Sequence, residues 1–196
     1  MLIGLTGPTG AGKSEVCAIL LEYGFDIIDA DLIAREVTAA GSECLLEIVS
    51  VFTDEILLPS GELNRKVLGL TVFSDEKQLK KLENIIFPHI LAEIDNRVKV
   101  LRLGSKGIFL DAPTLFESGA DKSCDKICCV LAPTELRKCR IIKRDNITPE
   151  AAELRMSSQP GDEFYTERSH YVIMNNGSEA ELQNAVRKML RSMNLE

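Results

Sequence analysis

The sequence predicts a three-layer α/β fold, in which helices cover both faces of a five-stranded parallel sheet. Five short apolar segments have the length and composition of β-strands, namely residues 2–6, 25–30, 107–112, 126–132 and 171–174. Several of these segments are continuously apolar, as expected for parallel strands that are buried on both faces. Helical patterns occupy the connections between them, and this alternation is typical of α/β proteins.

Length and composition indicate one globular unit with a full hydrophobic core. The chain has 196 residues, of which 45% are hydrophobic and 27% are charged, so a core can form without disulfides. The net charge of −7 argues against nucleic-acid or membrane binding, which needs a basic surface, whereas a local basic cleft can still bind small anions. Since there is no 18-residue apolar run and no signal-peptide pattern, we expect a cytoplasmic protein. We also expect a monomer.

The cysteines are expected to be reduced thiols that are buried or half-buried. The segment "CDKICC" at residues 124–129 suggests a metal site as the alternative, but it contains no CxxC pair. Cys128 and Cys129 would also point to opposite faces of a strand. The six positions are Cys17, Cys44, Cys124, Cys128, Cys129 and Cys139.

A glycine-rich segment, "GPTGAGKS" at residues 7–14, directly follows the first expected strand. It matches the pattern G-x-x-x-x-G-K-[ST] of a P-loop and lies in the required context, between a strand and a helix. The helix expected from "GKSEVCAILLEY" presents one apolar face, which consists of Val16, Ile19, Leu20 and Tyr23. The sequence therefore predicts a loop that binds a nucleoside triphosphate.

Each residue type in this loop suits phosphate. Glycines let successive N–H groups turn toward phosphate oxygens, and the following helix adds its positive N-terminal end. Lys13 can reach the β- and γ-phosphates, and the Ser14 hydroxyl can ligate Mg²⁺. An ordinary strand-to-helix turn, the alternative, explains the glycines but not the Lys-Ser pair. The expected nucleotide-binding residues here are Gly7, Thr9, Gly10, Ala11, Gly12, Lys13, Ser14 and Glu15.

Two aspartates end the second expected strand, where alternation places Asp29 and Asp31 on the same side of the chain. Asp31 can orient an acceptor hydroxyl and accept its proton, which suffices when the transition state is loose. The alternative is a helix N-cap followed by a solvated acid. Asp29 has either role, or it holds metal-bound water or substrate.

The connection over residues 32–106 is too long for a plain crossover and reads mostly as helix. Ser74 is expected to cap a helix over "DEKQLKKLENII", and Pro88 is expected to break or restart that helix. The strand that follows ends in Asp111, which serves Mg²⁺ through water or caps the turn before Pro113. Helical insertions of this kind lie where substrates enter, above the carboxyl ends of the strands.

A second long connection, residues 133–169, is helical and basic. Arg140 and Arg144 lie four residues apart on one helix face, where like charges repel unless an anion joins them. The planar fork of arginine suits phosphate, whereas a merely solvated basic face is the alternative. The other basic residues of this connection are Arg137, Lys138, Lys143 and Arg155.

Helix caps are also readable in the last third of the chain. Thr148 is a candidate N-cap and Pro149 a first-turn proline. Ser178 and Glu181 form the S-x-x-E pattern of a capping box, which opens the final helix.

With these motifs the chain resembles the dephospho-CoA kinase family over nearly its whole length. The matching segments are "GLTGPTGAGKS", "DADLIAREV", "GELNRKVLGLTVF", "LDAPTLFESG", "KRDN", "RMSSQ" and "VIMNNGS". The resemblance implies a P-loop kinase fold with three parts. They are a core (1–31, 107–132 and 170–196), a helical substrate region (32–106) and a mobile lid (133–169).

The resemblance also implies a reaction, in which ATP with Mg²⁺ phosphorylates the ribose 3′-hydroxyl of dephospho-CoA. Asp31 matches the family's base, and Arg140 and Arg144 match lid arginines that meet phosphates. Asn176 and Gly177 match positions that hold adenine. The expected catalytic residues are Lys13, Asp31, Arg140 and Arg144, and the expected substrate-binding residues are Thr6, Asp31, Arg65 and Asp111.

The chain departs from the family pattern at Phe87-Pro88, where the family often has His-Pro, and His89 lies two residues on. Two other functions stay open. One is a P-loop kinase for a nucleoside, a nucleotide or a sugar. The other is a regulator that binds ATP without transferring phosphate, which the acid and the lid arginines disfavour.

Overall fold

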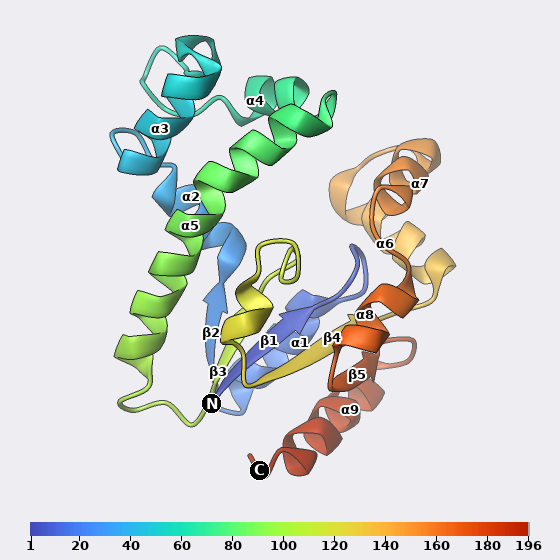
Figure 1. Ribbon diagram of the computed structural model, residues 1–196. Helices are drawn as coiled ribbons and strands as arrows, with labels where there is room; N and C mark the ends of the chain where they lie inside the picture. Colours follow the sequence, from blue (N-terminus) through green and yellow to red (C-terminus); the bar gives the residue numbers. More distant parts are fainter. Residues whose placement is uncertain (196) are drawn as a thin grey trace. The chain divides into compact units, whose positions relative to one another are not determined.

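The computed structural model describes residues 1–195, with the backbone alone at Phe73 (Figure 1). By its internal contacts the chain divides into two compact units. One unit is the segment Asp29–Lys99, and the other is built from the segments on either side of it. The first of these units is called the helical unit below, and the second is called the sheet unit.

The sheet is five-stranded and parallel, with the strand order β2-β3-β1-β4-β5. Its strands are β1 (Leu2–Thr6), β2 (Asp26–Asp29), β3 (Ile108–Asp111), β4 (Lys126–Leu131) and β5 (Tyr171–Met174). This confirms the predicted fold class and all five strands. Strand β2 ends one residue earlier than predicted because Ala30 already begins a helix.

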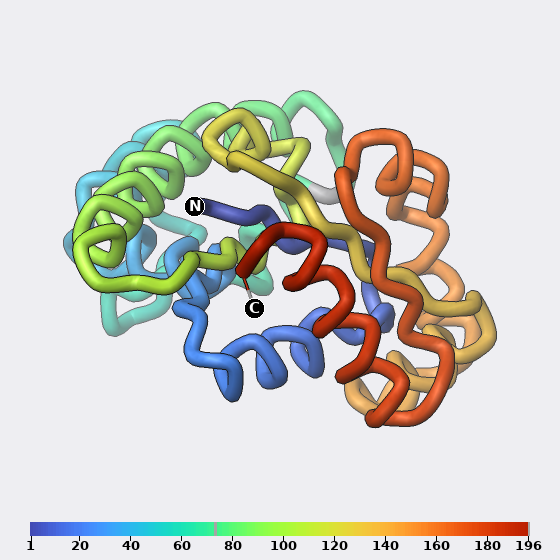
Figure 2. Tube along the Cα trace, turned by 90° about the horizontal axis from the view of Figure 1, so that it is seen from below, coloured from blue at the N-terminus to red at the C-terminus, as the bar shows by residue number. Residues whose placement is uncertain are grey.

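One face of the sheet is covered by α1 (Lys13–Glu22) and α9 (Glu179–Ser192), which lie side by side in Figures 1 and 2. Their apolar side chains form one buried cluster with those of the strands. The predicted inner face of α1 is confirmed at Val16, Ile19 and Leu20, whereas Tyr23 is only partly buried. Burial of this apolar surface fixes the helix that follows the glycine-rich loop.

The opposite face carries α8 (Asp162–Arg168), whose Tyr165 packs against Cys129 and Leu131 of β4. Phe116 and Phe164 extend this cluster with an edge-to-face ring contact at 5.5 Å. Because neighbouring residues of β4 point to opposite sides, Cys128 joins the other cluster. Helices thus cover both faces, as the three-layer prediction requires.

Two further helices follow β4, α6 (Thr134–Asp145) and α7 (Pro149–Ser157). Both predicted caps are confirmed. The Thr148 hydroxyl accepts a hydrogen bond from the backbone of Ala151, and Pro149 opens α7. Ser178 and Glu181 form the complete capping box of α9.

The helical unit has a core of its own. It contains α2 (Ala30–Val37), α3 (Glu43–Phe52), the 3₁₀ turn η1 (Asp54–Ile56), α4 (Arg65–Phe73) and most of α5 (Glu76–Leu101). Another 3₁₀ turn, η2 (Ala120–Ser123), belongs to the sheet unit. Buried apolar residues of this core include Cys44, Leu45, Ile48, Leu68 and Val72.

Two predictions about α5 are wrong. Pro88 does not break the helix, because apolar residues on both sides of it are packed, among them Ile86 before it and Ile94 after it. Tertiary packing therefore outweighs the lost hydrogen bond at proline. Ser74 ends α4 instead of capping α5, and the Asp75 carboxylate accepts from the N–H of Lys77.

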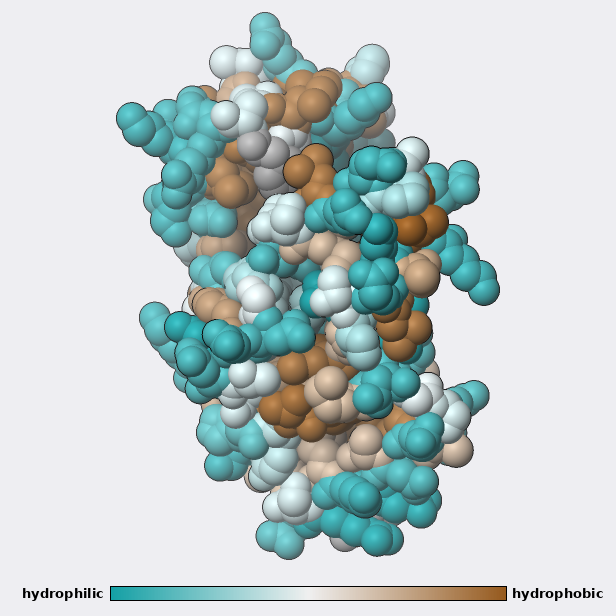
Figure 3. Space-filling model, turned by 90° about the vertical axis from the view of Figure 1, so that its right-hand side faces the viewer, coloured by the Kyte–Doolittle hydropathy of each residue, from teal (hydrophilic) through white to brown (hydrophobic). Residues whose placement is uncertain are grey.

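All six cysteines are free thiols, and five of them are buried or half-buried as predicted. Cys139 is exposed, which corrects the prediction, because the inward side of α6 is formed by Arg137 and Ile141, and Cys139 lies between them on the other side. Within residues 1–195 there is no helix long and apolar enough to cross a membrane. The face shown in Figure 3 is mostly hydrophilic, with small apolar areas.

Candidate functional site

The glycine-rich loop connects β1 with α1, and its backbone requires glycine. Gly7, Gly10 and Gly12 have φ values of 140°, 77° and 97°, which side-chain-bearing residues rarely adopt. A Cβ atom at Gly7 would lie 2.2 Å from the carbonyl oxygen of Val130, and one at Gly12 would lie 2.0 Å from Nδ2 of Asn175. The glycines thus let the loop curl tightly against β4 and the end of β5.

The first turn of α1 follows this loop without a capping side chain, since its N-cap is Gly12. Lys13 opens the helix and folds back, so that Nζ donates to the Gly7 carbonyl at 3.2 Å. Ser14 and Glu15 are exposed in the same turn. An ammonium group and helix N–H groups are therefore gathered at one loop, an arrangement that suits a phosphate chain.

Side chains from much later in the sequence hold the loop backbone. Nη1 of Arg140 donates to the carbonyls of Gly10 and Ala11, both at 3.3 Å. Nδ2 of Asn175 donates to the Ala11 carbonyl at 3.0 Å, and its Oδ1 accepts from Arg140 at 3.3 Å. The predicted phosphate-binding Arg140 is therefore also an anchor of the loop.

Asn175 contacts the glycine-rich loop, although the sequence analysis did not predict it as a site residue. The residues predicted there are Asn176 and Gly177, which are exposed between β5 and α9. A Cβ atom at Gly177 would lie 2.2 Å from a carboxylate oxygen of Glu181, so the capping box requires this glycine. The alternation of inward- and outward-pointing residues along a strand could have identified Asn175. It lies two residues beyond the buried Ile173 and therefore also points inward.

Arg144 differs from Arg140, although it lies one turn further along α6. It is exposed, and its Nε and Nη2 donate to the two carboxylate oxygens of Asp145, both at 2.8 Å. Arg155 pairs with the same carboxylate. The hydrogen bonds that Arg144 donates to the Asp145 carboxylate raise the pKa of Arg144, and the charge of Glu15 adds to this shift. Arg144 thus lies within electrostatic reach of the first turn of α1.

The ends of β1 and β3 carry two further predicted residues. Thr6 is fully buried, and its hydroxyl donates to the Pro113 carbonyl at 3.5 Å. Asp111 is half-buried, and its Oδ2 accepts from Cys17 Sγ at 3.6 Å. Since Cys17 lies three residues after Ser14, Asp111 approaches the side of α1 that carries Ser14.

The oxygen donors of this region fit Mg²⁺. The Ser14 hydroxyl and the Asp111 carboxylate are hard ligands, which this ion prefers. Residues 1–195 contain no group of three or more His, Cys, Asp or Glu side chains that could hold a metal ion. Such a sparse donor set suits a magnesium ion held mainly by nucleotide phosphates and water.

The two aspartates after β2 do not lie on one side of a strand, as the alternation predicted. Asp29 is the N-cap of α2, and its Oδ1 accepts from the N–H of Leu32 at 2.9 Å. Asp31 is exposed in the first turn of that helix. The helix begins at Ala30, so helical geometry replaces strand alternation at this point.

Two arginines come together in the helical unit. Arg65 opens α4, and its Nη2 donates to the Thr38 hydroxyl at 2.7 Å. Partial burial lowers the pKa of Arg65, and the positive charge of Arg35 lowers it further. Arg35 is not among the residues that the sequence predicts to bind substrate. His89 pairs with Glu47 at 3.0 Å, so the histidine near Phe87 has a partner within the helical unit.

Comparisons with known proteins show which family this chain matches. The dephospho-CoA kinase family model matches residues 1–181. A dephospho-CoA kinase from Listeria monocytogenes is 38% identical over 185 residues, which cover 94% of this chain and 92% of the relative. A solved dephospho-CoA kinase from Campylobacter jejuni is 31% identical with a TM-score of 0.73, covering 98% of this chain and 96% of that one.

A more distant structure shares the fold alone. The shikimate kinase from Acinetobacter baumannii is 17% identical with a TM-score of 0.56, and the match covers 98% of this chain and 92% of that one. The three-layer arrangement around a P-loop is therefore common to kinases whose named substrates differ.

Proposed function

The chain belongs to the dephospho-CoA kinase family, and we propose that it transfers the γ-phosphoryl group of ATP to the ribose 3′-hydroxyl of dephospho-CoA. The products are ADP and coenzyme A, and this reaction is the last step of coenzyme A synthesis. The observation that carries the proposal is the glycine-rich loop at residues 7–14, called the phosphate loop below. Lys13 folds over this loop and Arg140 is bonded to its carbonyls, in a chain that matches the family model over residues 1–181.

The loop is the proposed ATP site. In this proposal the N–H groups of Gly10, Gly12, Lys13 and Ser14 would face the β- and γ-phosphates, and Lys13 would exchange its contact with the Gly7 carbonyl for phosphate oxygens. Ser14 would ligate Mg²⁺, and Asp111 would hold water bound to it. The metal, when bound, neutralises charge that develops on the phosphates. Asn176 and Gly177 are the proposed adenine contacts, since they lie exposed beyond β5.

Transfer requires a base and a cation. We assign the base to Asp31, whose exposed carboxylate in the first turn of α2 can accept a hydroxyl proton. We assign the cation to Arg144, whose two N–H groups now face Asp145 and match two phosphate oxygens equally well. Phosphoryl transfer goes through a loose transition state, so positioning and charge supply most of the acceleration.

The proposed acceptor site lies in the helical unit. Arg35 and Arg65 repel each other, and an anion placed between them would remove that repulsion. Dephospho-CoA is such an anion, because it carries a diphosphate. The proposed substrate contacts within the helical unit are therefore Asp31 and Arg65. From the resemblance to the family we also propose substrate contacts at Thr6 and Asp111 of the sheet unit, for which the Thr6 hydroxyl would have to leave the Pro113 carbonyl.

Further sequence-based expectations stay predictions. They are the division into core, substrate region and mobile lid, the monomeric state, the cytoplasmic location, and the absence of nucleic-acid and membrane partners. Phosphate-loop kinases close a lid to exclude water, which supports the assignment of residues 133–169.

An acceptor panel tests the proposal. Purified protein with MgATP is offered dephospho-CoA, a nucleoside, a nucleotide and a sugar separately, and ADP formation is followed for each. We expect stimulation by dephospho-CoA alone. Stimulation by another hydroxyl compound would favour a related kinase. Nucleotide binding without acceptor-dependent ADP would instead indicate a regulator.

A further inference from the structure

One residue of the phosphate loop is held on both sides by side chains of the 133–169 connection. The N–H of Thr9 donates to Oε1 of Gln159 at 2.8 Å. The carbonyl of Thr9 accepts from Nε of Arg137 at 3.0 Å. Arg137 and Gln159 lie 128 and 150 residues from Thr9 in the sequence, so these contacts form only in the folded protein.

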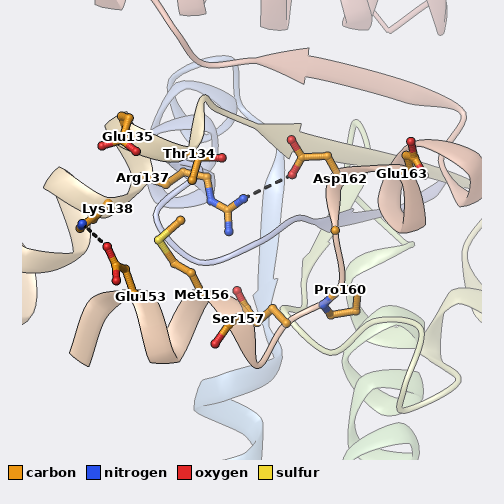
Figure 4. Close-up of a pocket in the computed structure, with 12 residues that line it drawn as sticks. Thr134, Glu135, Arg137, Lys138, Glu153, Met156, Ser157, Pro160, Asp162 and Glu163 are labelled. Atoms are coloured by element: carbon orange, nitrogen blue, oxygen red, sulfur yellow. Dashed lines mark hydrogen bonds and ion pairs between the residues drawn. The ribbon is translucent and has the colours of Figure 1, made fainter. Parts of the chain in front are cut away.

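Arg137 is held tightly in this position. Its side chain is only 6% exposed, and burial lowers the pKa of the guanidinium. A buried guanidinium is costly unless its donors are satisfied. Here Nε bonds the Thr9 carbonyl and Nη1 pairs with Asp162 at 3.3 Å, as the dashed line in Figure 4 shows. The acid and the loop carbonyl thus fix the arginine together.

Gln159, Arg137 and Asp162 line one cavity, which has a volume of about 690 Å³. The rest of the lining includes the charged residues Lys138 and Glu153, which pair with each other (Figure 4). The contacts that join these cavity residues to the loop are the two hydrogen bonds to Thr9.

Building on the proposed function, we propose that Gln159 and Arg137 are positioning residues for ATP binding. They hold the two peptide planes of Thr9, so the neighbouring loop N–H groups already point toward the phosphates before ATP arrives. Neither side chain needs to touch the nucleotide.

Gln159→Leu in the full chain is the direct test, because it removes the acceptor and keeps much of the side-chain volume. Losing one hydrogen bond of this kind is expected to raise the Kd for MgATP about fivefold to tenfold. The Thr9 amide should exchange faster with deuterium, whereas the KM for dephospho-CoA should not change. Gln159→Glu keeps an acceptor oxygen and should restore protection of the Thr9 amide.

Arg137→Lys is the second variant, because lysine keeps the charge but lacks the Nε–H donor. It should also weaken MgATP binding, and Asp162→Ala should do so to a smaller extent. Glu163→Gln is the matched control, since Glu163 lines the same cavity and is exposed. This control should bind MgATP like the parent protein.

Failure of this proposal can be distinguished from failure of the proposed reaction, because binding of MgATP is measured without any acceptor. An unchanged Kd and unchanged Thr9 exchange in Gln159→Leu would overturn the positioning role. A lower melting temperature with an unchanged Kd would do the same, since it indicates stability alone. An equal rise of Kd in Glu163→Gln would also overturn it, because the cavity as a whole would then be responsible.

Discussion

The phosphate loop and the helical unit present their candidate residues in different ways. In the loop, the backbone of Thr9, Gly10 and Ala11 is bonded to side chains from residues 137–175. In the helical unit, Asp31 and Arg65 are exposed in the first turns of two helices. One region is a backbone shape fixed by long-range contacts, and the other is a charge pattern on helix ends.

Because of this difference, we expect the two regions to favour ligand binding in different ways. A preformed loop lowers the cost of ordering residues around a phosphate chain. Charges such as those of Arg35 and Arg65 repel one another and thereby favour an anionic ligand. Substitutions that affect the loop should therefore change ligand binding by altering the shape of the loop backbone. Substitutions in the helical unit should change ligand binding by altering its local charge.

Arg144→Ala should have the largest effect, because this arginine is not bonded to the loop and is assigned to the transferring phosphoryl group. We expect kcat to fall by about 10³-fold or more, with the fold unchanged. Steady-state kinetics with both substrates saturating measure this. Lys143→Ala, an exposed neighbour on the same helix, is the control. Near-parental turnover in Arg144→Ala would remove Arg144 from the mechanism.

Asp31→Asn should have the next largest effect, since the amide cannot accept the hydroxyl proton. The expected loss is about 10²-fold or more in kcat, with little change in the Kd for MgATP. Glu43→Gln changes an equivalent first-turn acid of α3 in the same unit and should retain activity. A loss of ATP binding in Asp31→Asn would contradict the separation of the two regions.

Arg65→Met should raise the KM for dephospho-CoA about tenfold, as expected for the loss of one charged hydrogen bond. The KM for ATP should not change, because Arg65 belongs to the acceptor side. Initial rates at varied concentrations of each substrate measure the two constants, with Lys66→Met as the control. A rise in the KM for ATP instead would reverse the assignment of the two regions.

Ser42→Ala should have the smallest effect on function. The Ser42 hydroxyl caps α3 by accepting from the N–H of Leu45 at 3.2 Å, and losing such a cap costs about 1 kcal/mol. Denaturant unfolding should show this loss, and Ser42→Asp should recover most of it. A matching fall in kcat would mean that α3 contributes directly to the reaction.

Much of the fold could be predicted because its signals are local. Apolar runs gave the five strands, and Thr148, Ser178 and Glu181 gave the helix caps. The spacing of Gly7, Gly12 and Lys13 predicted the loop. In each case the residues that carry the signal also make the structure.

Several of the misses have a common physical cause, since contacts between residues far apart in the sequence decided them. Pro88 stays inside α5 because both halves of that helix are packed. Asn175 and Gln159 bond a loop that lies more than 140 residues earlier in the sequence. No local pattern in the sequence reports such partners. The phosphate contact of Arg140 stays a prediction, and its bonds to the loop carbonyls are a further finding of the structure.

The most direct test of the central claim is the transfer of labelled phosphate from γ-labelled ATP. Purified protein with Mg²⁺ is incubated with and without dephospho-CoA, and the labelled product is identified by mass and by the position of its phosphate. The account predicts that coenzyme A, labelled at the ribose 3′-phosphate, forms together with ADP, and that Asp31→Asn forms almost none. Label in inorganic phosphate alone, or on a different acceptor, would contradict it.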